Sequence, residues 1–164
     1  MMKQEELSKL ITQVLQTMLP PKMTLKLAQY VMAKVEEKAS DMGINVVIAV
    51  SNEGARPVAV HCMDNAFIAS YDVAVNKAYT VVALKMSTTT LKGLSQPEQT
   101  LYGIQFTNHG QIIIFGGGEP ILYEGKVIGG LGVSGGTEEE DTKLAAYGKS
   151  MLEEALKCQL VKDK

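Results

Sequence analysis

The sequence has few of the residues that commonly recognise nucleic acids or stack on bases. Among 164 residues, Arg56 is the only arginine, tryptophan is absent and phenylalanine occurs three times. One guanidinium group cannot bind several phosphates, and there are too few aromatic side chains for an extensive surface on which bases could stack. The formal net charge of −2 is too small to indicate a polyanionic partner. We expect no nucleic-acid partner.

Long apolar runs and paired cysteines are also lacking. The most apolar stretches, 46–50 and 112–115, have the length of a strand, whereas a membrane-spanning helix needs about 20 residues. Cys62 and Cys158 show no C-x-x-C spacing, which predicts neither a disulfide framework nor a zinc site. The sequence also lacks the unbroken apolar region of a secretory signal. These features predict no membrane association and favour a reducing cytoplasm.

The composition, with 46% hydrophobic and 21% charged residues, is that of a globular protein of one domain. In residues 5–19 apolar side chains recur at steps of three and four, which predicts an amphipathic helix, and Pro20 and Pro21 end it. We therefore expect two parts. Residues 1–21 form a helix and linker, and residues 22–164 form the main domain.

Hairpin turns and helix signals predict the architecture of that domain. Helices are expected at 24–42, at 65–86 and from just after Thr137 to about Leu160, and residues 87–108 are predicted to form a long loop with a helical turn. The expected strands are 44–51, 57–62, 111–115, 121–123 and 126–133, with turns at 52–54, 116–120 and 124–125. Strands joined mainly by hairpins indicate an α+β fold, an antiparallel sheet flanked by α-helices.

Glycines are concentrated in the last third of the chain. Residues 130–135 match G-x-G-x-x-G, but these glycines fall within an expected strand instead of at a strand-to-helix turn, which argues against a dinucleotide site. We interpret Gly132 as a position where another backbone or a flat ligand approaches the sheet closely. Gly116, Gly117 and Gly118 form either a loop for a ligand or a turn that needs positive φ.

Polar residues in three places suggest binding. Ser134, Gly135, Gly136 and Thr137 precede a helix, whose free N–H groups either bind a carboxylate or phosphate or belong to a capped turn. Lys77 and Asp64 either assist such a ligand or form a salt bridge. His61 and His109 are candidate metal or heme-iron ligands, or else ordinary surface residues. Other side chains that could ligate a metal are Cys62, Met63, Tyr71, Tyr79 and Tyr102.

Several segments together resemble the GlcG/HbpS/PduO C-terminal domain family of heme-binding proteins, over residues 23–158. The matching residues are Met63-Asp64, Asp72-Val73-Ala74-x-x-Lys77-Ala78-x-Thr80, Leu101-Tyr102-Gly103-Ile104, Phe115-Gly116-Gly117-Gly118-x-Pro120-Ile121, Val127-Ile128-Gly129-x-Leu131-Gly132-Val133-Ser134-Gly135-Gly136-Thr137 and Asp141. The resemblance implies a profilin-like fold, a dimer-based homo-oligomer that extends to an octamer, and heme, or alternatively cobalamin, as the cofactor. It implies no particular reaction.

Two departures from the family pattern each introduce a histidine. His61-Cys62 stands where relatives have an acidic residue and arginine, and Asn108-His109 stands where they have Asn-Gly. The loss of the arginine removes a partner for a ligand carboxylate. The two imidazoles and the Cys62 thiol are groups that can ligate a metal. The departures therefore fit either a site that has drifted away from the family's ligand or a rearranged heme ligation.

The first helix with its proline linker is similar to the peptides that target cargo to bacterial microcompartments. The PduO branch of the family belongs to such compartments, so shell proteins are expected partners and the compartment interior an expected location. The alternative is a helix that packs on its own domain or on a neighbouring subunit.

The leading hypothesis is a heme- or corrinoid-binding accessory protein. The tetrapyrrole would lie against the glycines at 116–118 and 132–136 near Lys77 and Asp64, and His61 or His109 would hold the metal. One alternative is an enzyme or regulator that binds an organic acid at the helix start formed by residues 134–137. Another is a structural oligomeric scaffold, because a fold alone does not determine function.

Overall fold

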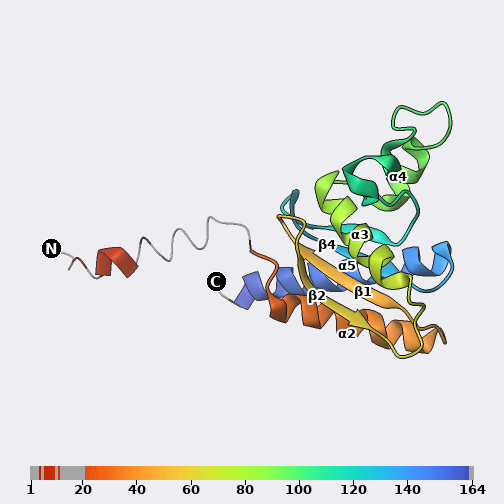
Figure 1. Cartoon of the computed structure of the whole chain (residues 1–164). Helices are drawn as coiled ribbons and strands as arrows, with labels where there is room; N and C mark the ends of the chain where they lie inside the picture. The colour runs from red at the N-terminus through yellow and green to blue at the C-terminus, as the bar shows by residue number, and fades with distance from the viewer. Residues whose placement is uncertain (1–3, 5, 10, 12–20, 163–164) are drawn as a thin grey trace.

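The computed structural model describes residues 4, 6–9, 11 and 21–162 (Figure 1). Its sheet has four antiparallel strands in the order β2-β1-β4-β3, as follows: β1 (Val47–Asn52), β2 (Pro57–Cys62), β3 (Gly118–Tyr123) and β4 (Lys126–Ser134). The helices around it are α2 (Leu25–Asp41), α3 (Ser70–Ala83), α4 (Thr88–Leu94) and α5 (Glu138–Lys162), with short 3-10 turns η1 (Ile104–Phe106) and η2 (Asn108–Gly110). The α+β fold expected from the sequence is confirmed.

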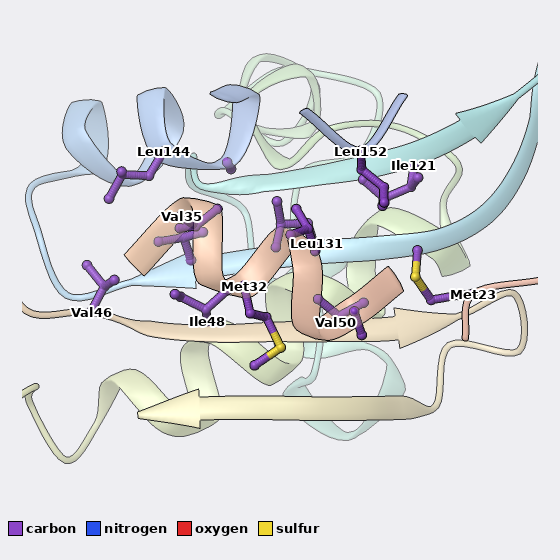
Figure 2. Packing of buried hydrophobic residues seen from close by; sticks show 14 of the residues in the cluster. Met23, Met32, Val35, Val46, Ile48, Val50, Ile121, Leu131, Leu144 and Leu152 are labelled. Carbon is purple, nitrogen blue, oxygen red and sulfur yellow. The ribbon is translucent and has the colours of Figure 1, made fainter. Parts of the chain in front are cut away.

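The two faces of the sheet are covered by different helices (Figure 1). Because side chains alternate along a strand, Ile48 and Val50 of β1 pack with α2 and α5, while Val47 and Ala49 pack with α3. Figure 2 shows the larger cluster, in which Leu131 of β4 is surrounded by side chains of α2 and α5. Each fully buried aliphatic side chain there contributes about 1.5–3 kcal/mol to stability.

Local signals place several element ends where the sequence predicts them. The Thr24 hydroxyl accepts a hydrogen bond from the Leu27 amide at 3.2 Å, which caps α2. Gly43, with φ of +71°, follows the end of that helix. At the hairpin between β3 and β4, Glu124 and Gly125 both have positive φ, as a two-residue turn of type I′ requires.

The strand predicted at 111–115 and the turn predicted at 116–120 are wrong. Residues 112–114 pair with no strand. The Ile113 amide instead donates to the Thr80 hydroxyl of α3 at 3.0 Å. The sheet begins only at Gly118, which pairs with Gly132, so β3 includes part of the predicted turn. The hydroxyl satisfies a backbone donor that a strand partner would otherwise have to satisfy.

The helix predicted at 65–86 is shorter than expected. Asn65 and Lys85 both have positive φ, a conformation that a right-handed helix does not contain, and α3 spans only the residues between them from Ser70 to Ala83. Within the segment predicted to form the first helix, the described residues 6–9 and 11 are helical. The rest of that prediction lies outside the described residues. In the described part of the chain we find no helix with the length and hydrophobicity of a membrane span.

Candidate functional site

The glycines of β4 allow α3 to touch the sheet with its backbone. A methyl group on Gly130 would lie 2.5 Å from the carbonyl oxygen of Ala78, and one on Gly132 would collide with the Ala74 carbonyl and the Ala78 amide. The close approach expected at Gly132 is therefore made by the main chain of α3. On this side of β4 the space beside the glycines is filled by the helix.

Lys77 of α3 is fully buried between the helix and the sheet. Its ammonium donates to the Val133 carbonyl at 2.7 Å and to the Asp141 carboxylate at 2.8 Å, and it lies 5.1 Å from the centre of the Phe115 ring. Burial lowers the pKa of Lys77 and raises the pKa of Asp141, and the attraction between the two charges opposes both shifts. Lys77 thus pairs with Asp141, not with Asp64, which is exposed.

The loop of three glycines is closely packed against the same pair. Gly117 has φ of +106°, and a methyl group there would lie 2.6 Å from the Lys77 ammonium. The Gly116 amide donates to the Glu138 carboxylate at 2.9 Å, and the Gly118 amide donates to the Thr88 hydroxyl at 2.9 Å. All three glycines are buried, and neighbouring atoms of the chain occupy the side on which a side chain would stand.

The start of α5 is capped by the helix's own side chains. The Gly136 amide donates to Asp141 at 2.9 Å, and the Thr137 amide donates to Glu140 at 2.8 Å. The Glu140 amide in turn donates to the Thr137 hydroxyl at 3.3 Å, which completes a capping box. The hydrogen bonds that the Thr137 amide and the Thr137 hydroxyl donate to the Glu140 carboxylate lower the pKa of Glu140. Ser134 is buried at the end of β4. Because Asp141 and Glu140 already accept the hydrogen bonds of the Gly136 and Thr137 amides, a ligand carboxylate at this helix start would have to displace both side chains.

His61 lies in an open pocket of about 410 Å³ at the end of β2. The pocket is lined by Glu36, Asn45, His61, Cys62, Met63, Asp64 and Asn65. The imidazole Nδ1 is 3.0 Å from a carboxylate oxygen of Glu36, and the two side chains are 53% and 40% exposed. Cys62 is an exposed free thiol, whereas the Met63 sulfur accepts a hydrogen bond from the Val46 amide at 3.5 Å.

This pocket brings together four of the residues singled out in the sequence: His61, Cys62, Met63 and Asp64. Glu36 and Asn45 were missed, because α2 and the chain before β1 meet the end of β2 only in the folded sheet. Among the described residues no group of three histidine, cysteine or acidic side chains is arranged to hold a metal ion.

His109 does not line that pocket. It is exposed on a turn in which Asn108, His109 and Gly110 all have positive φ. The turn is linked to α3 by a hydrogen bond of 3.1 Å that the side-chain amide of Asn108 donates to the Tyr79 hydroxyl. The two histidines singled out in the sequence, His61 and His109, therefore lie at different places on the protein.

Comparison with known proteins identifies the class to which this fold belongs. The chain belongs to the HbpS-like family, since the family model described as "Haem degrading protein HbpS-like" matches residues 23–149. The family resemblance noted in the sequence is confirmed.

Two relatives illustrate the range of sequences that match. An uncharacterized 15.0 kDa protein of the dhaT-dhaS intergenic region of Citrobacter freundii is 44% identical over 122 residues, 74% of this chain and 86% of that protein. The corrinoid adenosyltransferase PduO of the same organism is 35% identical over 108 residues, 66% of this chain. The match spans only 32% of the length of PduO.

Solved structures share the fold. Klebsiella pneumoniae ORFY is 41% identical with a TM-score of 0.79, and the match covers 82% of this chain and 93% of ORFY. A PduOC:heme complex is 29% identical with a TM-score of 0.77, over 79% of this chain and 94% of PduOC. HbpS, at 24% identity and a TM-score of 0.72 over 82% of this chain and 92% of HbpS, shares the fold.

Proposed function

We propose that this chain is a heme-binding protein and that His61 supplies the axial ligand. The observation that carries the proposal is the likeness to PduOC, a chain of similar extent whose structure was solved with heme. The enclosed positions of the glycines favour the His61 pocket over the glycine loop as the place where the ligand binds.

The His61 imidazole is the donor of this pocket that suits heme. A porphyrin already supplies four nitrogen ligands, so the protein needs to add only one or two, and imidazole is a common axial ligand. No partner of His61 Nε2 is found in the part of the chain that the structure describes. The next residue, Cys62, offers an exposed thiol as a second group that can ligate a metal. Phe67 and Ile68, a few residues further along, are 71% and 96% exposed and offer apolar surface. Bound heme would supply an iron centre for redox chemistry or for binding small ligands.

Titration with hemin tests this proposal. We expect the purified protein to give a Soret band that is weakened and displaced by His61→Ala. His109→Ala is the matched control, because this second histidine is exposed but lies outside the pocket, and it should leave the band unchanged. Cys62→Ala distinguishes thiolate from imidazole ligation. An identical titration of the wild type and His61→Ala would reject His61, and failure of every variant and the wild type to bind hemin would reject heme binding.

A corrinoid is the alternative ligand, and the likeness to part of PduO supports testing it. The same variants are titrated with a cobalamin in place of hemin. A His61-dependent spectral change with cobalamin and none with hemin would replace heme by a corrinoid in the proposal. An oligomer that binds neither would favour the scaffold hypothesis.

We also propose that residues 1–21 direct the domain to a bacterial microcompartment, and that residues 22–164 assemble into a homo-oligomer. Leu7 and Ile11 are one helical turn apart and each is about half exposed, which leaves apolar surface for a partner. Deletion of residues 1–20 should leave the oligomer size unchanged and abolish co-purification with shell proteins. A truncated protein of altered size would favour packing of this helix within the oligomer.

A further inference from the structure

The two edges of the sheet differ in whether their outward backbone groups have partners. The sheet ends at β2 on one side and at β3 on the other (Figure 1). Along an antiparallel pair, residues that exchange backbone hydrogen bonds alternate with residues whose N–H and C=O groups face away from the partner strand. An edge strand therefore presents the backbone groups of every second residue to the outside.

The edge at β3 is closed. The Val133 amide of β4 donates to the Gly117 carbonyl at 2.8 Å. By alternation from this bond, the backbone groups of Gly118 and Pro120 face outward. The Gly118 amide donates to the Thr88 hydroxyl of α4 at 2.9 Å, and proline has no N–H. Neither outward position therefore offers a free donor to another strand.

The edge at β2 is open. The Met63 amide donates to the Val46 carbonyl at 3.1 Å, so by the same alternation the backbone groups of Cys62 and Val60 face outward. No partner for these groups is found among the described residues. Every residue of β2 is at least partly exposed, and the strand contains none of the lysine or acidic side chains that commonly keep an edge strand from pairing. The edge at β2 is therefore the one to which another strand can be added.

Charges at the two ends of β2 fit a second copy of the same strand. Arg56 precedes the strand and Asp64 follows it, and both residues are exposed. Neither forms an ion pair in the part of the chain that the structure describes. When two identical strands pair antiparallel about a twofold axis, the start of each strand lies beside the end of the other. A pairing centred on Val60 brings its outward groups face to face and sets Arg56 of each copy across from Asp64 of the other.

We propose that a second copy of the chain pairs with β2, antiparallel and about a twofold axis at Val60, with Arg56 of each copy paired to Asp64 of the other. The two sheets then form one continuous sheet, and the outward amides gain acceptors. Asp64 also lines the His61 pocket, whose lining contains no lysine or arginine, so the second copy brings a guanidinium to the rim of that pocket. This inference rests on the proposed homo-oligomer and does not depend on heme.

Charge reversal tests the ends of the interface. Arg56→Asp and Asp64→Arg should each raise the dissociation constant of the assembly by about tenfold or more, because like charges then face each other at both ends. The double variant Arg56→Asp/Asp64→Arg should restore wild-type assembly, since opposite charges meet again. Glu154→Arg, at an exposed position of α5, is the matched control and should leave assembly unchanged. Analytical ultracentrifugation measures the four variants.

A separate experiment tests the centre of the interface. Val60→Lys places a charge against its own symmetry copy and should prevent assembly, whereas Phe106→Lys, at an 83% exposed position of η1, should not. Hydrogen exchange should be slow at the Cys62 amide in the assembled wild type and fast in Val60→Lys. The Gly118 amide should stay protected in both, because its acceptor belongs to the same chain. Circular dichroism establishes that each variant is folded.

The outcomes separate this pairing from the other proposals. An oligomeric wild type with fast exchange at Cys62, or charge reversals that leave assembly unchanged or are not rescued by the double variant, would reject the β2 interface while the homo-oligomer stands. A monomeric wild type would overturn both. Heme binding is decided by the hemin titration and is independent of either result.

Discussion

The Lys77 ammonium and the Asp141 carboxylate lie 2.8 Å apart in the interior, although 64 positions separate the two residues in the sequence. The lysine is on α3 and the aspartate is in the first turn of α5, so the pair connects helices on opposite faces of the sheet. The lysine also bonds to the Val133 carbonyl of β4 and the aspartate to the Gly136 amide. The pair therefore holds together the region in which the family motifs lie.

Lys77→Met should lower the free energy of unfolding by about 3–5 kcal/mol, because it leaves the Asp141 charge buried without its partner. Urea denaturation followed by circular dichroism measures the loss. Lys77→Met/Asp141→Asn should be more stable than the single variant, since no unpaired charge remains and the asparagine oxygen still accepts from Gly136.

The matched control for that prediction is the surface pair of Lys92 and Glu138, at 2.7 Å with side chains 47% and 36% exposed. Water screens this pair, so Lys92→Met should cost no more than about 1 kcal/mol. Equal losses for Lys77→Met and Lys92→Met would show that burial of the first pair has no energetic consequence.

Gly132→Ala should destabilise the protein by about 1–3 kcal/mol or more, because its methyl group would collide with the α3 backbone, which cannot move aside as a side chain can. Gly93→Ala is the control: it is in α4 with nothing within 4 Å of the added carbon, and alanine is the better helix former. It should be neutral or stabilising by up to about 1 kcal/mol. Thermal unfolding compares the two variants. A Gly132→Ala variant as stable as the wild type would contradict the close packing of α3 on β4.

Thr80→Val should cost about 1–3 kcal/mol, because it keeps the shape of the side chain but removes the hydroxyl that accepts the Ile113 amide. Hydrogen exchange should show faster exchange at that amide. Thr89→Val is the control, at an exposed threonine for which no hydrogen bond is found in the described part of the chain. Unchanged protection of Ile113 in Thr80→Val would rule out the hydroxyl as its partner.

The capping box of α5 should make stability depend on pH. Hydrogen bonds from Thr137 lower the pKa of Glu140 in the folded state below its ordinary value of 4.5. The resulting stability is fully present above pH 4.5 and is lost as the pH falls through the lower folded-state value. Glu140→Gln should therefore be less stable than the wild type at neutral pH, and the difference should shrink under more acidic conditions. Glu139→Gln, at the exposed neighbouring position, should show no such trend; a difference for Glu140→Gln that grows on acidification would refute the assignment.

The parts of the fold that local chemistry determines could be predicted from the sequence. Thr24 and Gly43 mark the ends of α2, and Glu124-Gly125 marks a hairpin, because each needs only its nearest neighbours. The segment around Ile113 could not be predicted, because its apolar run has the appearance of a strand. Its backbone partner is a side-chain hydroxyl on α3, 33 positions earlier. A sequence pattern carries no record of such a distant partner.

In the candidate site, too, individual residues could be predicted from the sequence, but their distant partners could not. The sequence singled out Lys77 and the glycines, but it did not reveal that Asp141 is the partner of the lysine or that α3 fills the space beside Gly132. His61 was found as an isolated histidine. Its partner, Glu36, was missed, since the helix pattern of α2 marks this residue only as a polar position on the surface.

The contact between α3 and the glycines of β4 has a consequence for how this domain changes over time. Peptide atoms are the same whatever residue carries them, so replacing other side chains of α3 or β4 does not alter the surface on which the helix rests. Substitutions at the rim of the domain, for example around position 61 at the end of β2, can then accumulate without moving the scaffold. New ligand chemistry can arise at the edge of the sheet while its centre stays constant.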